Sequence, residues 1–371
     1  MSNSRVFSSQ GKKLFVVSLI GFHVVFFVGG FWSLLLFDAA LTYYFVRNRP
    51  SNEELVSSKK RSFSEKKCRR IVKTKRLKRK KKVDTSYPGF STVEEGSEKA
   101  ETSNLPKWRV PSENIKVRSG NYLKEKTKVD SAAPLYDCFG CDMFMTSDEE
   151  TYMSRDLKFP SDGIEKSLPG NVPNYFVITL TLPYDAPKIS FSGQHGPSKA
   201  VSVSLYFRIT KEAVKLLEDE ASDSDGRKNA CQLWKKWCDC ARDPSNEENK
   251  SFLGRFKLVP LVLNPDECLP SSMSAYNNKP MLVKRIGVTG LINQHVVEGT
   301  NMSVLEFTIN FHKFPFIAKQ AFSYLTQNVI QNIEAVLGFV VEGRLDEELP
   351  EVVVGMGQIC RPNPRQFFEK T

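Results

Sequence analysis

The sequence contains none of the short motifs that mark common catalytic sites. It has no GxSxG nucleophile elbow, no HExxH zinc-protease helix, no phosphate-binding P-loop and no dinucleotide fingerprint. Only four histidines occur, and His195, His295 and His312 fall in a Gly/Pro-rich loop, a connection and a strand end. We therefore expect a protein that is not an enzyme and that holds no cofactor.

Metal-binding patterns are equally sparse. Among eight cysteines, Cys138 and Cys141 form one CxxC, and no second CxxC completes a structural zinc site. The cysteines within 231–240 lie on a predicted helix, where their spacing does not give them a shared face. The acidic stretch 218–226 lacks the glutamate that closes an EF-hand calcium loop. We expect reduced thiols and no bound metal.

One long hydrophobic run stands near the amino terminus, after a short tail at 1–13. Residues 14–37 carry no formal charge, and at about 1.5 Å per residue a helix of this length crosses a hydrocarbon core of roughly 30 Å. The segment AALTYYFV would extend it to residue 46. A single transmembrane helix is the favoured interpretation. The alternatives are a re-entrant hairpin bent at Gly29 and Gly30, or a cleaved signal peptide, for which the run is too long.

Positive charge is concentrated immediately after this run. Residues 59–82 hold 15 lysines and arginines against the single acid Glu65, whereas the whole chain carries a formal net charge of only +11. Because cations beside a span tend to stay on the cytoplasmic side, the carboxyl-terminal region is expected in the cytosol, at the endoplasmic reticulum or the plasma membrane.

The basic segment predicts attraction to anionic membrane lipids. The residues we expect to contribute most are at its end: Lys78, Arg79, Lys80, Lys81 and Lys82. Nuclear import, nucleic-acid binding and a simple solvated spacer are the other interpretations of such a segment. The neighbouring hydrophobic run favours lipid over nucleic acid.

A folded domain is expected only further along the chain. Residues 47–106 are basic and then acidic, with few large apolar residues, and are predicted to be a disordered linker. Residues 107–371 contain regular apolar segments and are enough for one large domain.

Strand patterns outnumber helix patterns in this domain. Period-two alternation or β-branched runs predict strands at 174–183, 200–210, 256–264, 304–312, 335–343 and 351–360. Helices are predicted at 211–220, 227–242 and 315–332, the last with an apolar stripe at three- and four-residue spacing. The expected fold is therefore α+β, a largely antiparallel sheet with helices packed on one face.

A series of short motifs resembles the plant enhanced disease resistance 2 C-terminal domain, whose opening pattern is KVRSxNYxxDxxK. The matching segments, in family order, are 108–128, 139–144, 172–183, 204–210, 275–280, 306–322 and 341–351. Cys141 stands in the family's FGxD turn, normally apolar, so the CxxC is coincidental. Glu306 matches the first acid of an ExDxD strand, whereas Thr308 and Asn310 depart from it.

The resemblance implies a non-enzymatic regulatory role. Founding members join this domain to lipid-binding START and pleckstrin-homology modules and act in plant defence and cell death, while shorter relatives carry little but the domain. We expect a single-pass, membrane-anchored regulator whose cytosolic domain binds lipid or a membrane surface. The alternative is a membrane-tethered adaptor that binds an unidentified protein and has no lipid pocket.

Two groups of residues are candidates for the site. Phe322, Leu325 and Val329 would line an apolar pocket beneath the helix at 315–332. Charged residues of the opening and closing motifs would form either a structural ion pair or the rim of that pocket, unless they are unrelated surface positions. These residues are Arg118, Glu347, Glu348 and Glu351.

Overall fold

The computed structural model describes most of the domain and little before it. The described residues are 94–95, 107–148, 152–154, 157, 159–160, 164, 166–187, 198–219, 226–364 and 368–369. The predicted span at 14–37, the basic segment and nearly all of the predicted linker lie outside them. Among the helices of these described ranges, none combines the length and apolarity that a membrane crossing requires.

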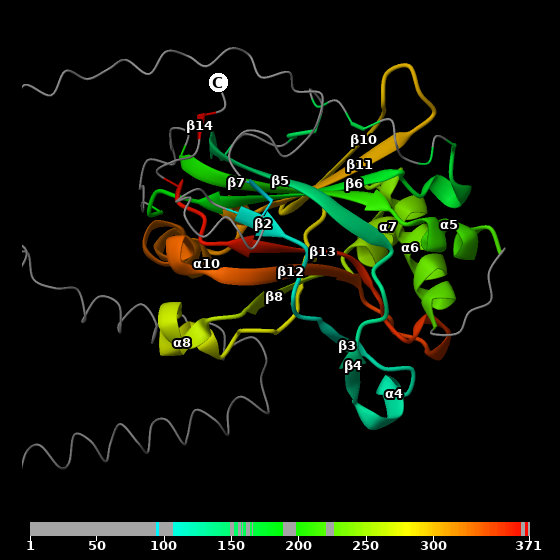
Figure 1. Ribbon diagram of the computed structural model, residues 1–371, viewed down its shortest axis with the longest axis horizontal. Coiled ribbons are helices and arrows are strands. Elements are labelled where there is room, and N and C mark those ends of the chain that lie inside the picture. The colour runs from blue at the N-terminus through cyan, green and yellow to red at the C-terminus, as the bar shows by residue number, and fades with distance from the viewer. Residues whose placement is uncertain are drawn as a thin grey trace, which may run out of the picture. The chain divides into compact units, whose positions relative to one another are not determined.

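Two six-stranded sheets form the body of the domain (Figure 1). The first sheet has the order β1 (Glu94–Glu95), β2 (Lys107–Arg109), β13 (Val353–Cys360), β12 (Glu334–Val341), β8 (Phe256–Val262) and β9 (Met281–Leu282). The second has the order β10 (Gly290–Val296), β11 (Ser303–Asn310), β6 (Tyr175–Pro183), β7 (Lys199–Ile209), β5 (Tyr136–Ser147) and β14 (Phe368–Glu369). Most neighbouring strands are antiparallel; β11 and β6 are parallel, as are two pairs at the edges.

The main hydrophobic core lies between the two sheets. Alternation along β6 and β7 turns Phe176 and Phe207 to the same side, where they meet rings from the first sheet. The Phe207 and Phe339 ring centroids are 5.8 Å apart, and those of Phe176 and Phe256 are 6.2 Å apart. The α+β class and the antiparallel strands agree with the sequence prediction. The single sheet does not, because the two sheets bury each other's apolar faces.

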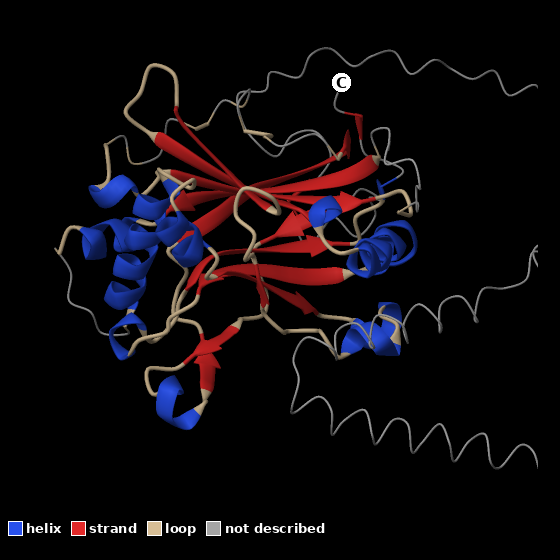
Figure 2. Cartoon of the chain, turned by 180° about the vertical axis from the view of Figure 1, so that it is seen from behind, coloured by secondary structure: helices blue, strands red, loops and turns tan. Residues whose placement is uncertain are grey.

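Helices close the ends of this two-layer body and do not cover one face of it (Figures 1 and 2). One end carries α5 (Lys211–Leu217), α6 (Arg227–Ala241) and α7 (Glu247–Leu253); the other carries α10 (Phe316–Tyr324), α8 (Pro265–Cys268) and α9 (Ser271–Ser274). Trp234 and Trp237 of α6 reach into the core. The Trp234 ring centroid lies 5.0 Å from that of Phe176, and the Trp237 ring centroid lies 5.5 Å from that of Phe307. Helix α6 thereby fills the open end between the sheets.

The predicted helix at 315–332 exists but changes character along its length. Regular α-helix ends at Tyr324, a wider π-type turn covers Leu325–Val329, and a 3-10 turn covers Ile330–Asn332. The Thr326 hydroxyl donates to the Phe322 carbonyl oxygen, 2.7 Å away. The side chains of this segment that face inwards pack on the end of the core.

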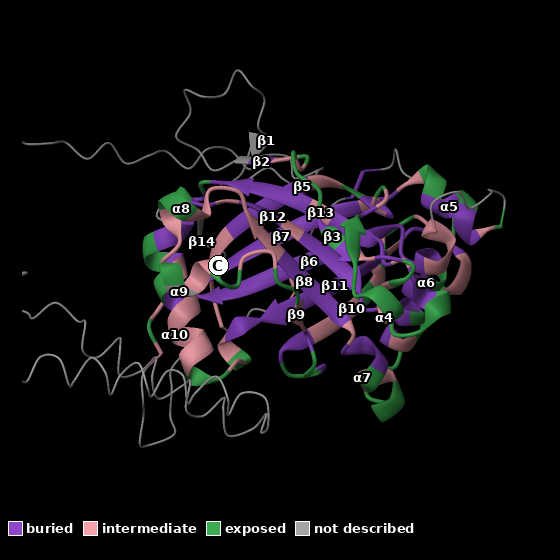
Figure 3. Cartoon of the chain, turned by 90° about the horizontal axis from the view of Figure 1, so that it is seen from below, coloured by how far each residue is buried: buried purple, intermediate pink, exposed green. Residues whose placement is uncertain are grey.

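A small lobe projects from the outward face of the first sheet (Figures 1 and 3). It consists of the hairpin β3 (Lys116–Arg118) and β4 (Lys128–Asp130), with α4 (Tyr122–Glu125) between them. Ile115 and Val117 anchor it on a second apolar cluster formed by Val259, Val336, Val340 and Val353. The lobe contains the opening motif of the family resemblance, and its underside forms one wall of the candidate site.

Candidate functional site

A pocket of about 230 Å³ lies between the β3–β4 lobe and the outward face of the first sheet. Its apolar wall comes from β3, β8, β9 and β12, and its polar wall combines cations and carboxylates from segments far apart in the sequence. The lining residues are Lys116, Val117, Arg118, Tyr122, Lys128, Lys257, Val259, Pro280, Leu282, Val340, Glu342 and Glu351. We refer to this cavity as the lobe pocket.

Strand alternation explains how charged side chains come to face the lobe pocket. In β8, Phe256 and Leu258 turn into the main core, so Lys257 and Val259 point to the opposite face. In β12, Phe339 and Val341 face the core, which leaves Val340 outward and places Glu342 outward just past the strand end. The pocket is therefore built on the rear of strands whose other face holds the domain together.

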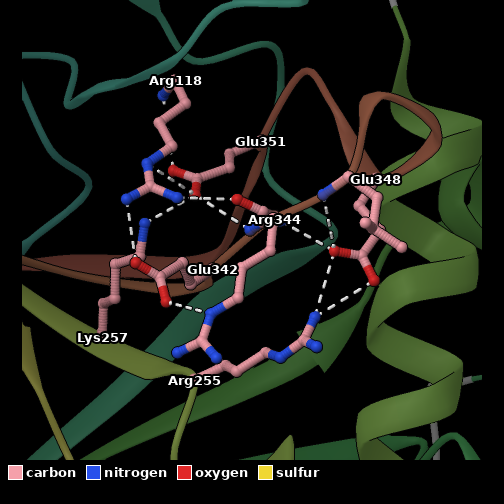
Figure 4. A network of polar contacts seen from close by, with 9 residues as sticks. Arg118, Arg255, Lys257, Glu342, Arg344, Glu348 and Glu351 are labelled. Atoms are coloured by element: carbon pink, nitrogen blue, oxygen red, sulfur yellow. Dashed lines mark hydrogen bonds and ion pairs between the residues drawn. The ribbon is translucent and has the colours of Figure 1, made fainter. Parts of the chain in front are cut away.

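Arg118 joins the lobe to the first sheet (Figure 4). Its Nη2 lies 2.8 Å from Oε1 of Glu342, and its Nη1 donates to the Gly343 carbonyl oxygen at 2.7 Å. Its Nε lies 3.6 Å from Oε1 of Glu351. Charge-assisted contacts to two carboxylates fix the guanidinium plane on the inner wall.

Lys257 and Glu351 form a buried ion pair beside Arg118 (Figure 4). The Lys257 Nζ lies 2.5 Å from Oε1 of Glu351, and their side chains are only 5% and 3% exposed. Burial lowers the pKa of Lys257, and the adjacent Glu351 carboxylate opposes that shift. Glu351 also accepts hydrogen bonds from the backbone N–H groups of Gly343 and Arg118, so the buried carboxylate is well satisfied.

Glu342 is held ionised by its cationic neighbours. Burial alone would raise its pKa, but the hydrogen bond from Arg344 and the charges of Lys257 and Arg118 bring the pKa below its ordinary value. The Arg344 Nε lies 2.8 Å from Oε2 of Glu342. Each carboxylate of the lobe pocket is thus neutralised by two cations. Arg118 contacts both carboxylates, Lys257 contacts Glu351, and Arg344 contacts Glu342.

The outer rim of the lobe pocket carries two cations with fewer contacts. Lys116 and Lys128 are exposed, and neither forms an ion pair with any residue that the structure describes. The Tyr122 ring lies under Arg118, whose Cζ is 4.7 Å from the ring centroid. Four cationic side chains therefore face two carboxylates, and the excess positive charge is on the solvent side.

A separate ion pair holds the closing motif in place. Arg255 Nη1 donates to both carboxylate oxygens of Glu348, at 3.1 and 3.0 Å, and the Arg344 backbone N–H donates to the same carboxylate at 2.7 Å. Arg255 also lies over the Phe252 ring, with Cζ 4.4 Å from the centroid. This pair lies outside the lobe pocket and fixes the turn at η6 (Asp346–Glu348).

The candidate site residues predicted from the sequence lie in several separate parts of the fold. Arg118 meets Glu351, Glu348 meets Arg255, and Glu347 is exposed. None of Phe322, Leu325 and Val329 lines the lobe pocket: Phe322 packs 4.3 Å from the Phe311 ring, and Leu325 and Val329 pack on Ile333 and Ala335 or the main core. The basic residues Lys78, Arg79, Lys80, Lys81 and Lys82 lie outside the described residues.

Sequence reasoning missed four of the six charged residues that line the lobe pocket. It did not single out Lys116, Lys128, Lys257 or Glu342. The position of Lys257 carried a usable signal, because a lysine inside the apolar strand FKLVPLVL either faces solvent or needs a buried partner. Nothing in the local sequence shows that this partner lies 94 residues away, at Glu351.

Glu306, the one acid retained from the ExDxD pattern, has a structural position on the second sheet. Its fully buried carboxylate accepts hydrogen bonds from the backbone N–H groups of Met153 and Ser154, at 2.8 and 3.0 Å. The hydroxyls of Ser154 and Thr179 donate to it at 2.6 and 2.8 Å. This carboxylate fastens the 152–154 segment to β11 and β6.

Possible metal ligands and cysteine thiols are dispersed over the described parts of the chain. No group of three or more His, Cys, Asp or Glu side chains there could hold a metal ion. Cys138 and Cys141 lie on β5, where the pairing with β7 shifts register between Cys138 and Gly140. The FGxD motif is therefore a bulge inside a strand and not a turn. Burial raises the pKa of the Cys141 thiol well above its ordinary value, which disfavours the reactive thiolate.

Comparison with known proteins identifies a family for most of the chain. The family described as Protein ENHANCED DISEASE RESISTANCE 2, C-terminal, matches residues 108–362, which are more than half of the sequence. No curated protein and no solved structure matches the chain significantly. The matched region begins at Trp108 and includes every residue that lines the lobe pocket.

Proposed function

The chain belongs to the enhanced disease resistance 2 C-terminal family, and from this membership we propose that it is a non-enzymatic regulatory protein, anchored in a membrane, whose cytosolic domain binds anionic lipid at the bilayer surface. Defence or cell-death signalling is the process in which such a regulator would act, by analogy with the founding members of the family. The domain would act at the membrane face to which the hydrophobic run at 14–37 attaches it.

The observation that carries this proposal is the excess of positive charge at the mouth of the lobe pocket. Lys116 and Lys128 are exposed beside Arg118 and Tyr122, and all four belong to the family's opening motif. An exposed cluster of cations beside an aromatic ring suits the phosphate of a lipid headgroup. The basic segment at 59–82 would add long-range attraction of the same sign.

The dimensions of the lobe pocket favour a headgroup over a whole lipid. Pockets that enclose drug-sized ligands have about 300–1,000 Å³, whereas this one has about 230 Å³. At the other end of the domain, Phe322 packs against the Phe311 ring, and Leu325 and Val329 lie against aliphatic neighbours. We therefore propose that the lipid tails stay in the bilayer and that only the headgroup enters the domain.

The membrane contribution of the basic segment can be tested with vesicles. A fragment of residues 47–371 should bind vesicles containing phosphatidylserine at low salt and lose them as salt is raised, since exposed charges are screened within about 10 Å at 0.1 M salt. Replacing Lys78, Arg79, Lys80, Lys81 and Lys82 by Gln should remove several kcal/mol of attraction, at about 1 kcal/mol per cation. Co-sedimentation measures the bound fraction.

A charge-conserving variant is the matched control for that experiment. Exchanging the four lysines of this group for arginine keeps every charge and should leave binding unchanged. If the fragment binds neutral vesicles equally well before and after the Gln exchange, electrostatic attachment is wrong. The protein-interaction adaptor would then be the better interpretation.

A further inference from the structure

We infer that the lobe pocket is a specific site for a phosphomonoester dianion, distinct in selectivity from the general attraction of the basic segment to anionic surfaces. This inference deepens the proposed function and rests on it for the source of the anion, a phosphorylated lipid headgroup. The same chemistry would also hold a soluble phosphate compound, so the experiment below separates the two sources.

Charge balance is the first reason. The lining holds the cations Lys116, Arg118, Lys128 and Lys257 and the carboxylates Glu342 and Glu351, which leaves an excess of two positive charges. A phosphomonoester carries about −1.5 to −2 charges at pH 7, whereas a phosphodiester carries one. A monoester therefore neutralises the pocket, and a diester leaves it partly unbalanced.

Donor geometry is the second reason. Arg118 has five N–H donors, and its contacts with Glu342, Gly343 and Glu351 hold the guanidinium without using all of them. Lys257 has three donors, and the structure records one acceptor for them, Glu351. The carboxylates thus fix the two inner cations in place, and donors remain for the oxygens of an anion.

The apolar wall is the third reason. Val117, Val259, Val340, Pro280 and Leu282 form the apolar part of the lining, so water screens the cations only from the open side of the pocket. Charge interactions strengthen as the effective dielectric constant falls. At about 30 Å³ per water molecule, the volume holds several waters, or one phosphate group with the first atoms of its ester.

The rim provides the variants for a test. Lys116 and Lys128 line the pocket, are exposed and take no part in the buried network, so K116Q/K128Q should leave the fold intact. Lys124 and Lys284 are also exposed, lie outside the lining and form no ion pair with other residues in the described ranges. K124Q/K284Q therefore removes the same charge from the same domain and is the matched control.

The experiment is calorimetric titration of the full chain in nonionic detergent at 0.15 M salt. The probes are inorganic phosphate, dioctanoyl phosphatidic acid, which is a monoester, and dioctanoyl phosphatidylserine, which is a diester. We expect phosphate and phosphatidic acid to bind and phosphatidylserine to bind at least about tenfold more weakly. K116Q/K128Q should weaken binding of both monoester probes by about tenfold or more, since two charge-assisted contacts are lost. K124Q/K284Q should change it less than about twofold.

Several results would overturn the inference: no phosphate binding, equal affinity for the two lipids, or equal losses in the two double variants. Tighter binding of phosphatidic acid than of inorganic phosphate assigns the site to a lipid headgroup, whereas equal binding assigns it to a soluble phosphate. If anionic vesicles bind in the earlier experiment while monoesters fail here, this inference alone is wrong. If monoesters bind here and vesicles do not bind there, the membrane function is wrong and the site remains.

Discussion

Lys257 and Glu351 show at the scale of single residues how the domain holds a charged group inside an apolar surface. Each charge is almost completely buried, and each would be costly without its partner. Glu351 also receives two backbone N–H groups, while Lys257 has the carboxylate as its recorded acceptor. The pair links β8 to the segment before β13, and through Arg118 to the lobe.

Breaking this pair should destabilise the domain far more than breaking an exposed pair of the same network. K257M leaves Glu351 buried without its closest cation, and we expect a loss of about 3 kcal/mol, at the lower end for such pairs because Arg118 remains nearby. R344Q removes a cation that is 46% exposed, so less than about 1 kcal/mol should be lost. Urea unfolding of both variants measures the difference, and equal losses would contradict a buried pair.

Glu342 gives the network a pH dependence. Its pKa is lowered in the folded protein, so its contribution to stability is present above its ordinary pKa of 4.5 and is lost as the pH falls through the lowered value. The E342Q variant should therefore be less stable than the unaltered protein near neutral pH, and the gap should narrow below about pH 4.5. Unfolding free energies at several pH values test this. A gap that stays constant down to pH 3 would show that the carboxylate charge is irrelevant.

The attachment of the lobe to strand β12 depends on a close approach between two elements. A Cβ atom built on Gly338 would lie 2.1 Å from Cδ1 of Ile115 and 3.4 Å from its Cγ1. Ile115 is completely buried, so it cannot move away without disrupting the second apolar cluster. Glycine at 338 thus lets Ile115, which anchors the lobe, pack directly against β12.

This contact predicts a specific rescue. G338A should cost about 1–3 kcal/mol through overpacking. I115V removes only the Cδ1 atom and should cost about 0.5–1.5 kcal/mol by itself. In the I115V background the methyl group added by G338A has room, because the Cδ1 atom that it would meet is absent. Adding G338A to I115V should therefore lower the unfolding free energy only slightly. A double-mutant cycle measured by thermal or urea unfolding gives the coupling, and additive losses would contradict the proposed fit.

Elements with strong local patterns could be predicted from the sequence, and elements made by long-range contacts could not. The sequence predicts strands at 174–183 and 200–210, and β6 and β7 occupy these positions as an antiparallel pair. Strand β5 was not expected, because its bulge interrupts the period-two alternation and places Cys138 and Gly140 out of phase. The edge strand β10 was missed since its polar side chains give no buried face.

The candidate site shows the same difference between residues in local motifs, which the sequence identifies, and residues brought together by long-range contacts, which it does not. Arg118 and Glu351 could be singled out because they belong to recognisable motifs. Lys257 lies in β8, outside the matching segments, and Glu342 lies just past the end of β12. The local sequence does not show that β8 and β12 are neighbouring strands, which is what brings these two side chains to one pocket. The apolar stripe of the helix at 315–332 does not predict what its side chains contact, because the same stripe can line a cavity or fill a core.

For the whole molecule, the proposed membrane orientation has a chemical readout. The chain contains two glycosylation sequons, at Asn249 and Asn301. Asn301 is exposed in the turn between β10 and β11, whereas the Asn249 side chain donates to the Asp243 carbonyl oxygen at 3.0 Å. If the domain is cytosolic, both stay unmodified. An endoglycosidase-sensitive mass increase at Asn301, the more accessible of the two, would reverse the proposed orientation.

The most direct test is whether the family domain binds anionic lipid without help from the rest of the chain. Residues 107–371 contain the main core, the second apolar cluster and the complete lobe pocket, but neither the hydrophobic run nor the basic segment. We expect this fragment to float with vesicles that contain phosphatidic acid at 0.15 M salt, and K116Q/K128Q to lose at least about tenfold in affinity. Flotation equal to that with phosphatidylcholine alone, or unaffected by K116Q/K128Q, would contradict lipid recognition by the domain.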